Sequence, residues 1–391
     1  MPGSLKKVIV PLSETNIPRP DVSIEMRTME VALPEETTTS PEQTRPVEAS
    51  VVRKYLLSRG NSAIADKSFK ALMAICAASI FGIVVLIASE LVISSQLSWH
   101  KFGLEFFYKL NVDPDTHLPT FWDPVAGTFY ALPFLYGTLV SSLVALVIAV
   151  PLAVGSAIFL TEMCPKLLRG PLAFVTELLA AIPSVVYGLW AVFVLVPLLR
   201  EHINPVLMSI FNSEIAVKTL GWTGLVGETG LFGGVNYGLG MLAAGVILAV
   251  MILPIISSLT REVMSAVPHS QREAALALGA TRWEMIRMGV LRNARIGIVG
   301  SIILGLGRAL GETMAVAMVI GNRPEISKSL LSLGHSMSAV IANEFSEASD
   351  NLYLSALIEI GLALFVVTII VNALARFLVW MVTRGVPARV N

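Results

Sequence analysis

Long apolar stretches separated by polar segments dominate the pattern of this chain. The first, Ala71–Ser89, has nineteen residues without a charge. As a helix it would be about 28 Å long, enough to cross the hydrocarbon core of a bilayer. Five similar stretches follow, so we expect six membrane-spanning helices and predict an all-α polytopic membrane protein. The expected spans are residues 71–93, 135–161, 177–199, 237–259, 296–320 and 352–382.

Prolines occur inside several of these predicted spans. Pro151 lies in the second span, Pro183 and Pro197 lie in the third, and Pro254 lies in the fourth. Proline frees backbone carbonyls and kinks helices, which is tolerated where neighbouring helices or water satisfy those groups. The prolines therefore favour shaped helices around a pathway.

Composition agrees with a membrane protein and excludes several other classes. Hydrophobic residues make up 54% of the 391 residues, charged residues 14%, and the mean hydropathy is +0.73. The formal net charge is zero, and no basic tract with interleaved aromatic residues predicts nucleic-acid binding. Two cysteines, Cys76 and Cys164, cannot support a disulfide framework or a metal site. We expect no bound metal.

The N-terminal residues 1–65 differ from the rest of the chain. They are rich in Pro, Thr, Glu and Arg and show no sustained hydrophobic period. Such a segment cannot bury enough apolar surface to offset the entropy lost on ordering. We therefore expect a disordered N-terminal extension, followed by a transmembrane domain over residues 66–391.

Lys and Arg residues are distributed unevenly among the segments that connect the spans. If the N-terminus is inside, fifteen lie in inner segments, six of them arginines between Arg261 and Arg295. Six lie in outer segments, namely Lys101, Lys109, Arg200, Lys218, Arg323 and Lys328. Because positive charge is retained on the cytoplasmic side, both termini and residues 261–295 are predicted to be cytoplasmic.

The segment 261–295 carries two apparent helix-capping signals. Ser270 with Glu273, and Thr281 with Glu284, have the spacing of a capping box. Gly279 lies between them as a left-handed helix stop. The pattern predicts two short helices that meet at a bend. One interpretation is a plain connecting loop, and the other is a docking element, because helices this short need a partner or tertiary contacts.

The fifth predicted span carries two charged residues. Arg308 and Glu312 are four residues apart, on one face of a continuous helix, and Thr313 follows. A charge buried in a bilayer costs at least about 2.5 kcal/mol, so these residues suggest function. They are either a self-neutralised structural pair or the site where Arg308 offers paired hydrogen bonds to an oxyanion.

Glu273-Ala274-Ala275 with Gly279 resembles the cytoplasmic coupling loop of ABC-transporter permeases. The segment Arg308-Ala-Leu-Gly-Glu312-Thr-Met-Ala-Val with Ile320-Gly-Asn322 resembles the PstC-type permease subunits of bacterial phosphate importers. The likeness covers about residues 136–382. One departure is that Arg292 stands after Leu291, where the family's pattern usually has proline.

This resemblance implies a type I ABC-importer permease fold (MetI-like) in the bacterial inner membrane. It implies that Arg308, Glu312 and Thr313 lie on the phosphate path, while Glu273, Ala274, Ala275 and Gly279 couple to the ATPase. The implied partners are a PstA-type permease, a PstB-type ATPase dimer, a PstS-type external phosphate-binding protein and membrane lipid. ATP and Mg²⁺ would be used by the ATPase, with no cofactor bound by this chain.

Two rival function classes are a membrane enzyme and a secondary anion transporter. A membrane enzyme would need a clustered catalytic constellation, and the five histidines are scattered without a nucleophile motif. A secondary anion transporter would need carboxylates in several spans, for which Glu359 and Glu177 are the further candidates. A permease for another oxyanion also remains open, because phosphate is implied by the resemblance alone.

Overall fold

The computed structural model describes residues 62–109, 120–213, 217–219, 223–227 and 229–383. The chain divides at residue 75 into two units, which are described separately. In the first unit, the described part is the beginning of helix α2 (Ser62–Ser94). The predicted extension 1–65 lies outside the described residues except at its end, and its disorder stays a prediction.

Six stretches of the described chain are helical, long and apolar enough to cross a membrane. Four of them differ from the predicted spans mainly at their ends, by a few residues. The third begins later than predicted and the fifth ends earlier than predicted, as described below. The six stretches are Ala65–Ser94, Leu132–Met163, Ser184–Phe211, Met241–Ser265, Arg282–Leu310 and Asn351–Met381.

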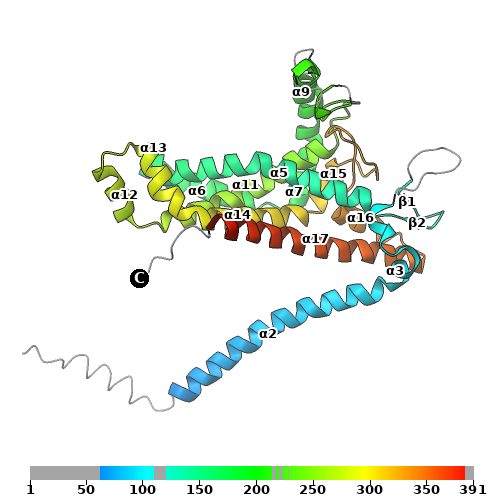
Figure 1. The fold of residues 1–391 in the computed structure, drawn as a ribbon, viewed down its shortest axis with the longest axis horizontal. Coiled ribbons are helices and arrows are strands. Elements are labelled where there is room, and N and C mark those ends of the chain that lie inside the picture. Colours follow the sequence, from blue (N-terminus) through cyan, green and yellow to red (C-terminus); the bar gives the residue numbers. More distant parts are fainter. Residues whose placement is uncertain (1–61, 110–119, 214–216, 220–222, 228, 384–391) are drawn as a thin grey trace, which may run out of the picture. The chain divides into compact units, whose positions relative to one another are not determined.

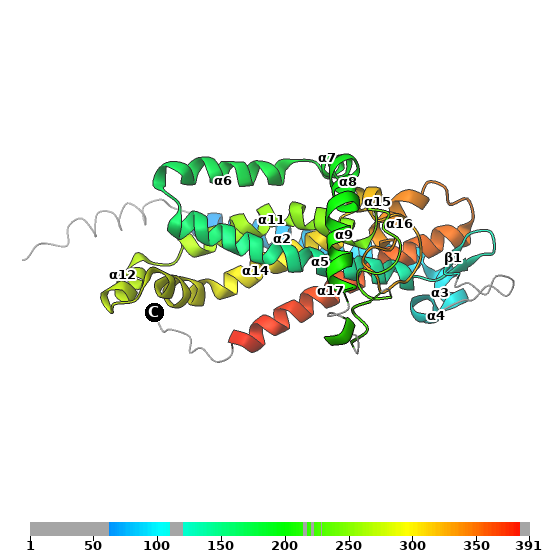
Figure 2. The ribbon, with the colours of Figure 1, turned by 90° about the horizontal axis from the view of Figure 1, so that it is seen from above.

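Three helices form the centre of the second unit. They are α5 (Leu132–Ile158), α11 (Met241–Ser265) and α14 (Arg292–Leu310), which run side by side in Figures 1 and 2. A row of fully buried alanines at every fourth position follows α5, namely Ala145, Ala149, Ala153 and Ala157. Such a row lets the backbone of a neighbouring helix approach closely. The sequence therefore makes α5 and α11 a tightly packed pair.

Glycines also allow α11 to pack closely against both α5 and α14. A β-carbon at Gly245 of α11 would lie 2.4 Å from the Val144 side chain of α5. One at Gly305 of α14 would lie 2.7 Å from the Ile256 side chain of α11. Both distances are far below van der Waals contact, so neither position has room for a side chain.

An aromatic cluster closes one end of the bundle, which we call the α16 end. It joins the strands β1 (Trp122–Asp123) and β2 (Thr128–Phe129), which pair antiparallel, to α16 (Met337–Glu344) and α17 (Asn351–Thr383). The Glu344 carboxylate accepts hydrogen bonds from Trp122 Nε1 and Tyr353 Oη, each 2.6 Å long. The short helices α3 (Gln96–Phe102) and α4 (Glu105–Tyr108) also lie at this end.

The predicted start of the third span at residue 177 was wrong. Glu177 lies in a separate helix, α6 (Lys166–Ala181), and the span begins after Pro183 at α7 (Ser184–Trp190). Proline disfavours a helical conformation in the residue before it, and Ile182 is extended, with ψ 130°. Pro183 therefore separates two helices instead of kinking one.

The third span continues from α7 through mixed helical turns. It alternates π-helical turns with short α-helical pieces and ends at Phe211. Arg200, predicted in an outer segment, lies inside this span. The pieces are η2 (Ala191–Leu195), α8 (Val196–Leu198), η3 (Leu199–Ile203) and α9 (Asn204–Phe211).

Candidate functional site

Helix α12 (His269–Ala277) lies at the other end of the bundle, which we call the α12 end (Figures 1 and 2). The predicted capping box of Ser270 and Glu273 was wrong. The helix begins directly after Pro268, so Ser270 lies inside the first turn and makes no cap. Proline presets a backbone angle suited to a helix start. The helix therefore begins at His269, before the residue that the capping signal predicted.

The end of α12 follows the prediction from Gly279. This glycine has φ +82°, the left-handed conformation expected of a helix stop. The Gly279 amide donates to the carbonyl of Leu276 (2.9 Å), and the Ala280 amide donates to the carbonyl of Ala275 (3.2 Å). These two bonds form a Schellman motif, which satisfies the last carbonyls of the helix.

The second capping box, at Thr281 and Glu284, is present. The Glu284 amide donates to Thr281 Oγ1 (3.4 Å), and the Thr281 amide donates to Glu284 Oε2 (2.8 Å). It opens α13 (Arg282–Glu284), which continues through the π-helical segment η5 (Met285–Leu291) into α14. The second helix is therefore not short, and Arg292 lies within continuous helix where the family's pattern usually has proline.

A shallow cavity of about 450 Å³ lies between α12 and the helix that follows it. Its lining combines small residues with the side chains of Leu278, Glu284 and Met288. Leu278 of the lining is 90% exposed, and Trp283 of the next helix is 60% exposed. Of the four coupling residues predicted here, Glu273, Ala274 and Gly279 are exposed, and Ala275 is half-buried in the cavity wall. Exposed apolar surface of this kind is typical of protein–protein contact sites.

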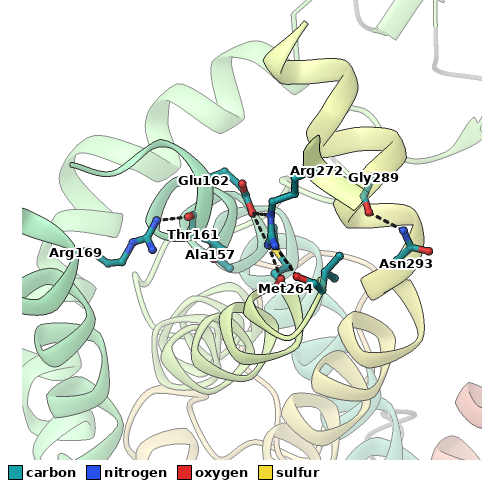
Figure 3. Close-up of polar contacts among 9 residues, drawn as sticks. Ala157, Thr161, Glu162, Arg169, Met264, Arg272, Gly289 and Asn293 are labelled. Carbon is teal, nitrogen blue, oxygen red and sulfur yellow. Dashed lines mark hydrogen bonds and ion pairs between the residues drawn. The ribbon is translucent and has the colours of Figure 1, made fainter. Parts of the chain in front are cut away.

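A buried arginine on α12 was missed by the sequence analysis. Arg272 pairs with Glu162 of the π-helical segment η1 (Phe159–Met163), which continues α5 (Figure 3). Their side chains are only 12% and 8% exposed. The sequence placed Arg272 among six arginines that indicated topology, and no local signal distinguished it. An acid 110 residues away is its partner.

The predicted continuous fifth span is broken near its end, and this prediction was wrong. Helix α14 ends at Leu310 with Gly311 as its C-cap, and α15 (Met314–Val319) starts after Thr313. Glycine disfavours the helix interior by about 1 kcal/mol relative to alanine, and three glycines crowd this segment. Ser338 Oγ of α16 donates to the carbonyl of Glu312 (2.7 Å), which compensates a backbone group freed by the break.

The break separates Arg308 from Glu312. Arg308 is exposed near the end of α14, while Glu312 and Thr313 are half-buried in the non-helical link. The two residues no longer share a helical face, and the ion pairs of the described residues do not include one between them. The guanidinium of Arg308 is therefore open to solvent or to a ligand. Non-helical backbone at membrane depth is tolerated where it is buried in protein or lines a water-filled cavity.

The carboxylates considered for a secondary transporter are not brought together. Glu177 pairs with Arg261 near the α12 end of the bundle. Glu359 is fully buried in α17, and neither of its carboxylate oxygens has a hydrogen-bond partner among the described residues. In the same residues, no three His, Cys, Asp or Glu side chains are grouped as metal ligands.

Residues 149–384 match the family described as binding-protein-dependent transport system inner membrane component. The phosphate transport system permease protein PstC of Mesorhizobium japonicum is 48% identical over 257 residues, which are 66% of this chain and 75% of that protein. The PstC protein of Haemophilus influenzae is 44% identical over 327 residues, or 84% of this chain and 96% of that protein.

A solved structure of a bacterial ABC transporter that imports alginate is 16% identical. It covers 81% of this chain and 98% of its own chain, with a TM-score of 0.49.

Six candidate spans, the last four of them within the family match, define a multi-pass transport permease of the inner membrane. The chain belongs to the binding-protein-dependent transport system inner membrane component family and, within it, to the PstC phosphate transport system permease proteins. The predicted fold class and the predicted resemblance are thus confirmed.

Proposed function

We propose that this chain is the transmembrane permease subunit of an ATP-driven importer and forms half of a pathway for inorganic phosphate. The observation that carries the proposal is the break at Gly311–Thr313, beside which Arg308 is exposed and unpaired among the described residues. A planar guanidinium with five donors suits a tetrahedral oxyanion. The names of the PstC relatives support phosphate as that anion.

Arg308, Glu312 and Thr313 form the substrate path in this proposal. The exposed Arg308 side chain makes the first contact with the anion. Glu312 and Thr313 lie in the link between α14 and α15, where a change of backbone conformation would alter access to Arg308. The remainder of the path comes from a second, homologous permease subunit of the PstA type.

The α12 end is the coupling site for an ATPase dimer of the PstB type. Glu273, Ala274, Ala275 and Gly279, with the shallow cavity beside them, form the docking surface. ATP and Mg²⁺ are used by that partner, so this chain has no catalytic role of its own. Both termini and α12 are cytoplasmic, and a PstS-type binding protein delivers phosphate at the α16 end.

Uptake by the reconstituted complex tests this function. Vesicles that contain this chain with its three partner proteins should accumulate phosphate when ATP is supplied and the proton gradient is collapsed. Uptake should stop when ATP is exhausted. Uptake that follows the gradient instead would indicate a secondary transporter, and accumulation of sulfate in preference to phosphate would indicate a permease for another oxyanion.

A further inference from the structure

Arg272 connects three structural elements at the α12 end. It belongs to α12 and contacts Glu162 at the end of α5, with Nη2 and Nε 3.0 Å and 3.2 Å from Oε1. Its Nη2 also donates to the carbonyl of Met264 (2.9 Å), and its Nη1 donates to the carbonyl of Val267 (2.5 Å). Those two carbonyls lie at the end of α11, as Figure 3 shows for Met264.

The guanidinium of Arg272 supplies hydrogen-bond donors beside the helix ends. The last carbonyls of a helix have no partner within the helix. Arg272 adds donors from one rigid, planar group to the Met264 carbonyl, which also accepts from the Val267 amide, to the Val267 carbonyl just beyond α11, and to the acid that follows α5. A lysine has a single charged nitrogen on a flexible chain and cannot reproduce this geometry. The pair is also nearly excluded from solvent, at 12% and 8% exposure, so salt will screen it little.

The neighbouring residue attaches α12 on its other side. Gln271 Oε1 accepts from Asn293 Nδ2 of α14 (2.5 Å), and Asn293 Nδ2 also donates to the carbonyl of Gly289 (2.6 Å). A β-carbon at Gly289 would lie 3.4 Å from the carbonyl oxygen of Gln271. Helix α12 therefore packs closely against the backbone of η5 at Gly289.

We propose that Arg272 is a positioning residue that holds α12 and the adjoining ends of α5 and α11 as one rigid unit. A displacement of α12 is then passed to the two most closely packed helices of the bundle. This inference rests on the proposed function in one respect, which is that an ATPase displaces α12. The side chain of Arg272 itself touches neither substrate nor nucleotide in this scheme.

Arg169 supplies a matched control. It also donates to a backbone carbonyl of η1, that of Thr161, but it comes from α6 and does not contact α12 (Figure 3). Replacing Arg169 removes a similar arginine–carbonyl contact from the same segment. Only Arg272→Gln should loosen α12 from the ends of α5 and α11, while the contacts of α12 with η5 and α14 remain. Glu162→Gln should have a smaller effect, because the contacts of Arg272 with Met264 and Val267 remain.

Pulsed electron paramagnetic resonance on the whole complex tests the rigid unit directly. Spin labels are placed at Ser270→Cys on α12 and Leu152→Cys on α5, both exposed, after Cys76→Ser and Cys164→Ala. The distance between the labels should stay narrow and unchanged on adding ATP. In Arg272→Gln it should broaden or shift with ATP, whereas Arg169→Gln should match the parent. A distance that changes with ATP in the parent, or stays narrow in Arg272→Gln, would overturn the proposal.

Coupling provides a second, independent measurement. Arg272→Gln should assemble and hydrolyse ATP but move about ten-fold less phosphate per ATP, within the range typical of coupling between sites. Arg272→Lys should recover part of that ratio. If assembly and uptake fall together at a constant ratio, Arg272 is only structural and the inference fails. If the parent complex takes up no phosphate, the proposed function fails instead, and the label distances still test the rigid unit.

Discussion

At the scale of single residues, variants of Arg308 distinguish a substrate-binding site from a structural ion pair with Glu312. The double change Arg308→Gln with Glu312→Gln should leave assembly normal, because no ion pair between the two residues is lost. Phosphate uptake should fall at least about ten-fold, since hydrogen bonds to charged groups contribute about 1.5–3 kcal/mol. Arg308→Lys should also be impaired, because a point charge does not replace the fork. Uptake and assembly are measured separately, and near-normal uptake by the double variant would refute the site.

His335 makes the stability of the protein depend on pH. It is 3% exposed, its Nδ1 accepts from the Ser336 amide (3.0 Å), and burial lowers its pKa from 6.5 to about 4. Between those values the unfolded chain binds a proton that the folded chain does not, so stability falls as pH falls. The loss at pH 5 should be roughly 2 kcal/mol.

Thermal unfolding of the solubilised complex between pH 7.5 and pH 5 measures this effect. His335→Asn keeps an acceptor for the Ser336 amide but does not titrate. Its unfolding midpoint should therefore decline less with acid than that of the parent. Equal slopes for the two proteins would show that other groups control the acid sensitivity.

The sequence indicated single functional residues better than it indicated contacts between residues. Arg308 and Gly279 could be selected because an intramembrane charge and a glycine after a helical run each carry a local physical signal. Arg272 could not, because its significance depends on Glu162, which reaches it only through the packing of α5 against α11. Contacts between residues distant in sequence have no local signature.

At the scale of elements, the end of α12 depends on one left-handed residue. Gly279→Pro should uncouple ATP hydrolysis from uptake, because proline cannot adopt φ +82° and removes the amide that donates to Leu276. Gly279→Ala should show a weaker defect of the same kind, since it keeps the amide and strains the backbone less. Phosphate moved per ATP is the measurement, and full coupling in Gly279→Pro would make the loop a plain connector.

Glu273→Lys examines the same element without altering its fold. Glu273 is exposed, and its structural cap on α12 proved absent, so the change should leave insertion and the unfolding midpoint intact. Binding of the ATPase to the permease pair should weaken if α12 is the docking element. Co-purification of the ATPase at increasing salt measures this, and unchanged co-purification with unchanged uptake would remove Glu273 from the docking surface.

The number of membrane-spanning helices was predictable from the sequence, but the breaks within them were not. Hydrophobic length determined the six spans. It did not show that Pro183 would separate α6 from α7, or that Gly311 would end α14 inside the predicted fifth span. Apolar residues continue across both breaks, and hydropathy does not register a change in backbone direction.

At the scale of the whole molecule, the charge distribution predicts orientation. Tags at both termini and in the loop between Ser270 and Glu284 should be reachable only from the cytoplasm. The charges that lie within the helical stretches, such as Arg200, do not enter this prediction. Labelling of intact cells and of opened vesicles tests this, and external access to the loop tag would reverse the orientation.

The π-helical segments next to α12 have a consequence for how the molecule can move. Glu162 lies in η1 and Gly289 lies in η5, so each of two contacts of α12 falls where a bundle helix carries widened turns. A π turn holds one residue more per hydrogen-bonded ring than an α turn. Conversion of one into the other therefore rotates the adjoining helix by about 100° per residue. Because Arg272 and Gln271 attach α12 beside both segments, such a rotation in this end of the bundle would require these contacts to break.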